Sequence, residues 1–137
     1  MTRTHQLIVV AALIVLSACG GPTAPTGPTP IIEVTGTLDF GNVKVGSSKL
    51  LTFTIYNRGT ETLRVTSVTV SNDISSVVAF PDFAVSRYYD VLPMGSFSLI
   101  VIFSPSGYRT YSGTLQVNGN QSSGNNKITI TGTGTQF

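Results

Sequence analysis

The only cysteine of the 137-residue chain, Cys19, follows a short apolar run near the amino terminus. Residues 7–16 read LIVVAALIVL, after a polar head that carries Arg3 and His5. This run is too short to cross a bilayer, which needs about 20 apolar residues, but it is typical of the apolar core of a secretory signal peptide. Because there is no second cysteine, a disulfide within the chain is excluded and the thiol of Cys19 is left for other chemistry.

The residues around this cysteine, Leu16-Ser17-Ala18-Cys19, resemble the lipobox of bacterial lipoproteins. The resemblance implies cleavage before Cys19, a diacylglyceryl group on its sulfur and acylation of the new amino group. Two or more acyl chains anchor a protein stably, whereas one gives marginal binding. The resemblance also implies a place in the bacterial cell envelope, and Gly20 favours the outer membrane if the source is Gram-negative. An ordinary signal peptide that contains a cysteine and a retained membrane helix are the alternatives.

Composition then divides the chain into three segments. Residues 1–18 are expected to be the lipoprotein signal peptide, residues 19–30 a lipidated tether and residues 31–137 one folded domain. The tether reads CGGPTAPTGPTP, a Pro-, Gly- and Thr-rich sequence that favours extended chain and builds no core. Fully extended, it spans at most roughly 40 Å, which keeps the domain close to the membrane. The remaining segment is long enough to bury a core without disulfides or metal.

The residue types of the expected mature domain argue against catalysis. The only histidine, His5, lies in the expected signal peptide, so Ser-His-Asp and Cys-His systems and the common zinc sites lack their ligands. No cofactor or metal is therefore expected beyond the lipid on Cys19. Charged residues make up 10% of the chain and show no basic cluster, which argues against nucleic acid as a partner. The acids of the domain form no recognisable calcium loop or acid/base motif: Glu33, Asp39, Glu61, Asp73, Asp82 and Asp90.

Period-two alternation of apolar and polar residues predicts β-strands along the domain. The clearest runs are 50–57 (LLTFTIYN), 62–71 with a bulge near Thr66-Ser67, and 97–104 (FSLIVIFS), which is apolar on both faces and predicts a central, covered strand. Residues 111–118 and 127–133 predict a hairpin joined by the polar loop 119–126. Shorter pieces are expected near residues 33–45, 77–83 and 88–92. About seven strands in this length indicate an all-β, immunoglobulin-like β-sandwich.

Several short stretches, taken in order, resemble the choice-of-anchor D domain of bacterial surface proteins, which is similar to the eukaryotic ASH (abnormal spindle–Hydin) domain. These stretches are LDFGNVKVG (38–46), FTIYNRGT (53–60), LPMG (92–95) before FSP (103–105), YSGTL (111–115) and ITGTG (130–134). The resemblance implies an immunoglobulin-like sandwich that serves as a non-catalytic interaction or spacer module. It implies no catalytic residues; it gives Gly41, Gly46, Gly59 and Gly95 places in turns, and Asn57 a place at a strand end.

Two functions remain open. The first is a membrane-anchored module that binds or scaffolds another envelope protein through a sheet edge or loops, with the Tyr88-Tyr89 pair and the loop 119–126 as candidate surfaces. The second is a carbohydrate- or peptidoglycan-binding module in which exposed tyrosines stack on sugar rings. Its candidate residues are Tyr88, Tyr89, Tyr108 and Tyr111.

Overall fold

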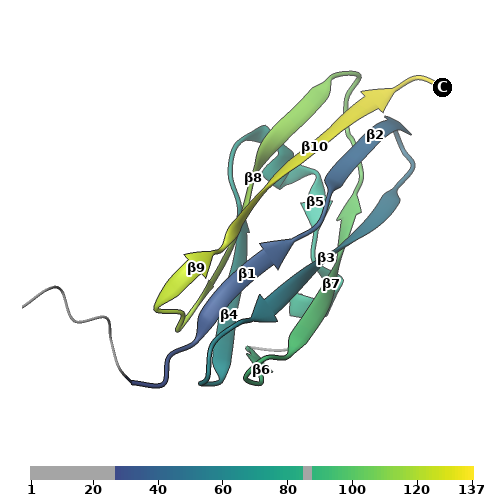
Figure 1. Ribbon diagram of the computed structural model, residues 1–137. Helices are drawn as coiled ribbons and strands as arrows, with labels where there is room; N and C mark the ends of the chain where they lie inside the picture. The colour runs from purple at the N-terminus through teal and green to yellow at the C-terminus, as the bar shows by residue number, and fades with distance from the viewer. Residues whose placement is uncertain (1–26, 85–87) are drawn as a thin grey trace, which may run out of the picture.

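The computed structural model describes residues 27–84 and 88–137, which form two five-stranded sheets packed face to face (Figure 1). The first sheet has the order β5-β7-β3-β1-β9 and the second the order β2-β10-β8-β4-β6. The strands are β1 (Ile31–Thr35), β2 (Leu38–Lys44), β3 (Lys49–Asn57), β4 (Leu63–Val70), β5 (Val78–Ala79), β6 (Tyr89–Val91), β7 (Ser96–Phe103), β8 (Thr110–Gly119), β9 (Ser123–Asn125) and β10 (Lys127–Thr135). The all-β, immunoglobulin-like sandwich expected from the sequence is confirmed.

The alternation in the sequence decides which side chains fill the space between the sheets. In β3, Phe53 and Ile55 point inward and are buried, while the alternate residues Thr52 and Thr54 face outward. Phe103 lies at the centre of the core, with its ring centroid 5.0 Å from that of Phe40 and 5.8 Å from that of Tyr111. Burying such aromatic and branched side chains supplies most of the driving force for folding. The core therefore needs no cross-link.

The chain crosses from one sheet to the other between β1 and β2, near Gly36, whose φ is 145°. β1 pairs antiparallel with β3, whereas β2 pairs parallel with β10 in the opposite sheet. The predicted hairpin of β8 and β10 is present, but its connection is more than a loop. Residues Ser123–Asn125 form β9, which pairs parallel with β1 and so ties the connection to the first sheet. The sequence did not predict this strand, because residues 119–126 are polar and rich in glycine and asparagine.

Two further predictions concern β4 and β7. The expected bulge in β4 is confirmed, because its register against β8 shifts between Val65 and Ser67. The expectation that β7 is central and covered on both faces is wrong. β7 has the two-residue β5 on one side, and Ile100 and Ile102 are half-buried because they lie on the outer face of the first sheet.

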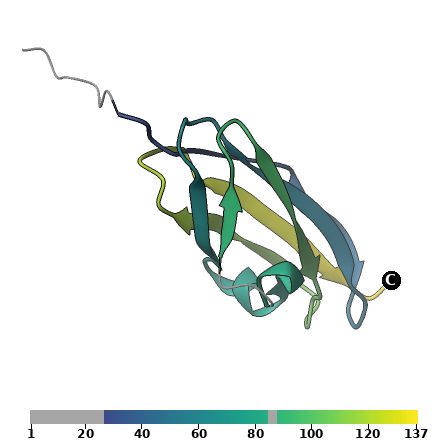
Figure 2. The same cartoon turned by 90° about the horizontal axis from the view of Figure 1, so that it is seen from below.

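Two short 3-10 helical turns lie between β4 and β6: η1 (Asp73–Ser76) and η2 (Pro81–Ala84). η1 packs on β8 and β4 of the second sheet, and η2 packs on β7 of the first. Together they close one side of the sandwich (Figure 2). Ile74 of η1 is fully buried and joins the core.

The sites expected near the amino terminus are not described by this structure. Cys19, the lipobox residues Leu16, Ser17 and Ala18, and most of the tether lie outside the described residues. Within residues 27–84 and 88–137, no helix has the length and apolar character needed to span a membrane.

Candidate interaction surface

The chain enters the sandwich at one end, which we call the tether end and define by Thr29, Pro30 and Ile31. The backbone of Thr29 accepts a hydrogen bond from the Thr60 amide (3.0 Å), and the carbonyl of Pro30 accepts one from the Ser122 amide (3.0 Å). The Arg58 amide donates to the carbonyl of Ile31 at 2.7 Å. Strand β6 lies at the same end, whereas the C-terminus lies at the opposite end (Figure 1). The last tether residues are therefore bound to the domain.

Asn57, the last residue of β3, is fully buried and organises this end. Its Oδ1 accepts hydrogen bonds from the amides of Ile31 (3.3 Å) and Gly59 (3.0 Å). Its Nδ2 donates to the carbonyls of Glu61 (2.6 Å) and Val91 (3.0 Å). One side chain thus joins the incoming chain, the β3–β4 loop and the end of β6. The sequence predicted a strand end here but not this network, because its partners lie as far as 34 residues away.

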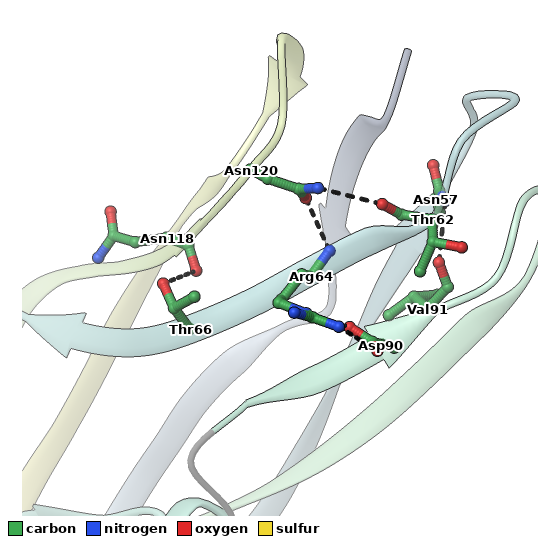
Figure 3. Close-up of polar contacts among 8 residues, drawn as sticks. All are labelled: Asn57, Thr62, Arg64, Thr66, Asp90, Val91, Asn118 and Asn120. Carbon is green, nitrogen blue, oxygen red and sulfur yellow. Dashed lines mark hydrogen bonds and ion pairs between the residues drawn. The ribbon is translucent and has the colours of Figure 1, made fainter. Parts of the chain in front are cut away.

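Beside Asn57, the flank formed by β4 and β6 carries the polar contacts drawn in Figure 3. Arg64 makes a bidentate ion pair with Asp90, at 2.8 Å from Nε and 2.9 Å from Nη2. Its guanidinium lies 4.3 Å from the ring centroid of Tyr88. The Arg64 amide donates to Oδ1 of Asn120 (2.7 Å), whose Nδ2 donates to the carbonyl of Thr62 (3.2 Å). The amide of Asn120 therefore fixes the loop after β8 onto β4.

The Arg64–Asp90 pair is exposed but well aligned. Hydrogen bonding from Arg64 lowers the pKa of the Asp90 carboxyl from its usual value, and the same bond raises the pKa of Arg64. Both groups therefore stay charged throughout the neutral range. Because the pair is solvated, it orders the flank more than it stabilises the fold.

The same arrangement recurs at two other arginines. Arg58 pairs with Glu33 and lies 4.3 Å from the ring centroid of Tyr56. Arg109 pairs with Asp73 at 2.7 Å and lies 4.4 Å from the ring centroid of Tyr111. Each arginine of the described residues is thus matched by a carboxylate and covers a tyrosine. At these three places the positive charge of the arginine is therefore compensated by a neighbouring carboxylate.

A shallow groove of about 520 Å³ opens on the second sheet, where β4, β8 and β10 meet. Its lining is uncharged except for one lysine and consists of Thr69, Val70, Ser71, Thr114, Gln116 and Lys127. Beside it, Nε2 of Gln116 donates to Oδ1 of Asn118 at 2.8 Å, and Nδ2 of Asn118 donates to Oγ of Ser67 at 3.2 Å. Two hydroxyl groups of the lining are also bound to the sheet backbone: Oγ1 of Thr69 donates to the carbonyl of Gln116 at 3.4 Å, and Oγ of Ser71 accepts from the Thr114 amide at 3.0 Å.

The four tyrosines singled out in the sequence do not form one exposed row. Tyr111 is 1% exposed and packs in the core, and Tyr89 is half-buried between Phe83 and Phe97. Tyr88 and Tyr108 are 50% and 70% exposed, but they lie near opposite ends of the sandwich. Tyr88 directly precedes β6, in which Tyr89 pairs with Val65 of β4. Val65 also pairs with Gly119, so Tyr88 lies near the last residue of β8, whereas Tyr108 lies just before its first. Strand β8 alone spans about 30 Å.

Two of the exposed sheet margins are protected by side chains. On β2, Nζ of Lys49 donates to the carbonyl of Phe40 at 2.7 Å, and Asp39 accepts from the Gly41 amide at 2.9 Å. On β7, Oδ2 of Asp82 accepts from the Ile100 amide at 3.0 Å. Side chains that occupy edge donors and acceptors hinder the addition of a further strand. The described β6, in contrast, pairs with only the first three residues of β4 and does not reach the part of β4 that lines the groove, Thr69 and Val70.

The described residues contain no group of three or more His, Cys, Asp or Glu side chains placed to hold a metal ion. What they present is a rigid sandwich with an ordered polar flank, a shallow groove and loops at both ends. The fold and these surfaces define the class of an immunoglobulin-like, ASH-type module. Within that class, the chain belongs to the HYDIN/CFA65/VesB-like family of Ig-like domains, whose sequence model matches residues 30–133.

Solved structures share this fold at low sequence identity. The ASH/PapD-like domain 7 of human CEP192 superimposes with a TM-score of 0.63 at 12% identity, over 96% of this chain and 99% of that chain. A protein of unknown function from Porphyromonas gingivalis W83 gives 0.59 at 20% identity, over 83% of this chain and 51% of that chain. The VesB protease of Vibrio cholerae gives 0.51 at 18% identity, over 74% of this chain and 30% of that chain. The chain therefore spans about half of the first bacterial protein and less than a third of the second, and these likenesses concern the fold. No curated protein matches the chain in sequence.

Proposed function

We propose that this protein is a non-catalytic lipoprotein, anchored through Cys19 in the bacterial cell envelope, whose domain binds or scaffolds another envelope protein. The observation that carries the binding role is the match of residues 30–133 to a family of Ig-like domains, on a fold shared with ASH/PapD-like domains. Such sandwiches present rigid edges and loops to partners. The membrane role rests on Leu16-Ser17-Ala18-Cys19 after the apolar run 7–16.

The groove between β4, β8 and β10 is the docking surface that we propose for a protein partner. It lies on the outer face of the second sheet, beside the β4–β6 flank, and its lining offers hydroxyl and amide groups with a single cation, Lys127. A partner backbone can use these groups as donors and acceptors, and the low charge reduces the desolvation cost. The edges of β2 and β7 are less suitable, because Lys49 and Asp82 occupy part of their backbone.

A glycan is the second candidate ligand. The groove favours it through hydroxyl and amide groups that can exchange hydrogen bonds with sugar hydroxyls. The tyrosine platform no longer supports it, because Tyr111 is buried and Tyr88 and Tyr108 are far apart.

Site-specific photo-crosslinking in the producing bacterium tests the proposal. A photoreactive amino acid replaces Thr69 in the groove, and the matched control replaces Thr52, which is also exposed but lies on the outer face of the first sheet. We expect one envelope protein to be captured from position 69 and not from position 52. Thr114→Arg, which fills the groove, should abolish the capture.

Equal capture from both positions, or no protein from either, would contradict the proposed surface. Capture of peptidoglycan or another glycan from position 69 alone would replace the protein partner by the second candidate.

A further inference from the structure

The turn between β6 and β7 exposes two large apolar side chains at the tether end. Leu92 is 68% exposed and Met94 is 70% exposed, and Pro93 between them is exposed too. The amide of Gly95 donates to the carbonyl of Leu92 at 2.9 Å, which closes a four-residue β-turn without a charged residue. Isolated exposed apolar residues are common, but neighbouring ones at the tip of a turn indicate a contact surface.

Met94 is also in an unfavourable backbone conformation. Its φ is 58°, in the left-handed region that glycine and asparagine adopt readily and other residues avoid. Glycine at this position would relieve the strain and remove an exposed apolar side chain. Neither the stability nor the solubility of the isolated domain favours methionine here. A strained residue that stability does not explain points to a role for its side chain.

The position of the turn indicates what covers it. The Asn57 amide donates to the carbonyl of Gly95 at 3.0 Å, while the Asn57 side chain accepts from the amide of Ile31. Asn57 therefore links the turn directly to the incoming chain. Both lie at the end of the sandwich opposite the C-terminus (Figure 1). Thr29, which is held by Thr60, lies only ten positions after Cys19, and ten residues reach at most about 35 Å. If Cys19 is lipidated, the tether end is held near the lipid surface.

The side chains behind the turn suit the headgroup region of a bilayer. Tyr88 lies under Arg64 and Tyr56 under Arg58, and each arginine is neutralised by an acid. Tyrosine and arginine are typical of membrane interfaces, where their apolar parts and polar ends lie in different layers. Glu61, an exposed acid on the adjoining β3–β4 loop, limits the contact to the interface.

We infer that the turn Leu92–Gly95 is a second membrane contact, which inserts Leu92 and Met94 into the interface of the bilayer that holds the lipid anchor. This inference rests on the proposed lipidation of Cys19. It makes the orientation of the domain fixed rather than free: the tether end faces the membrane, and the groove lies along the side of the sandwich.

Depth-dependent fluorescence quenching tests the inference on the mature, lipidated protein in phosphatidylethanolamine/phosphatidylglycerol vesicles. Met94→Cys places a label on the turn, and Tyr108→Cys, at a position with the same 70% exposure, places it at the opposite end. Since Cys19 is the only native cysteine and its sulfur is expected to carry the lipid, each variant has one reactive thiol. We expect an environment-sensitive label at position 94 to shift to the blue and to be quenched by lipids that carry a shallow spin label. The label at position 108 should show neither change.

Equal quenching at positions 94 and 108, or none at position 94 in protein that floats with the vesicles, would overturn the membrane contact while leaving the anchor intact. If neither variant floats and Cys19 also reacts with the label, the anchor is refuted, and the membrane contact with it.

Discussion

Replacement of Asn57 by alanine should remove a large part of the stability of this domain. The side chain makes four hydrogen bonds, and two of its partners, the Val91 carbonyl and the Gly59 amide, are buried. A buried group left without a partner costs about 1–3 kcal/mol. The Ile31 amide and the Glu61 carbonyl are partly buried and can turn to water, at roughly 0.5 kcal/mol each. The expected total is therefore about 3–7 kcal/mol.

A loss of that size is a substantial fraction of the ~5–15 kcal/mol that stabilises a typical domain. For a domain of this length it corresponds to a fall in Tm of roughly 12–28 °C, at about 4 °C per kcal/mol. The measurement is equilibrium unfolding in guanidinium chloride together with thermal unfolding, both followed by circular dichroism at β-sheet wavelengths, on the chain from Gly27 onward. Amide hydrogen exchange should also rise at Ile31 and Gly59, which lose their acceptor.

Asn125→Ala is the matched control, because the exposed Asn125 side chain accepts one hydrogen bond, from the Lys127 amide. We expect it to cost less than about 1 kcal/mol. Asn57→Asp keeps the acceptor oxygen but loses both donated bonds and buries a charge, so it should not rescue the alanine variant. If Asn57→Ala unfolds within about 1 kcal/mol of Asn125→Ala, the network does not hold the tether end together and this reasoning is refuted.

Three further substitutions probe the tether end and its flank. Gly59→Ala should destabilise the domain, because an added Cβ would lie 2.0 Å from the Thr29 carbonyl, and limited proteolysis should then cut the chain near Thr29 faster than in the wild type. Met94→Gly should keep or raise the unfolding free energy, by up to about 1 kcal/mol, because glycine tolerates the positive φ; a clear drop in denaturation midpoint would show that methionine supports the fold. Asp90→Asn should lower Tm only slightly at neutral pH, because the pair is exposed; since Arg64 depresses the pKa of Asp90, the difference from wild type should persist down to the ordinary value of 3.8 and vanish as the pH falls below the folded-state pKa. A difference in Tm that did not depend on pH would rule out the ion pair as its cause.

The fold was largely predictable because the information that determines it is local. Alternation in residues 50–57 and 62–71 predicts β3 and β4, and the change of parity between Val65 and Val68 predicts the bulge that the register shift confirms. The strand β9 was missed because Ser123, Gly124 and Asn125 have no strand propensity. Their pairing with β1 is decided by the chain more than ninety residues earlier.

The candidate surface was less predictable, because it depends on contacts between distant segments. The number of tyrosines suggested a sugar-binding surface. Whether each ring is exposed, however, depends on which face of its strand it occupies and on neighbours such as Phe103, which buries Tyr111. Gly59 was expected to be glycine because it lies in a turn. The structure gives a stronger reason, because the backbone of the tether packs so closely on it that a Cβ has no room. Asn57 was placed correctly at a strand end, yet its role follows from partners at Ile31 and Val91. A buried asparagine cannot be told from an exposed one by sequence spacing.

The measurement that tests the central claim most directly is the intact mass of the protein extracted from the membranes of the producing bacterium, followed by fragmentation of its amino-terminal peptide. The proposal predicts a chain that begins at Cys19 and carries a diacylglyceryl group on the sulfur, with a further acyl chain where the amino group is modified. Cys19→Ala should yield an unlipidated chain that leaves the detergent phase. A wild-type chain that begins elsewhere, or that carries an unmodified Cys19, would contradict the claim that this domain works from a lipid anchor.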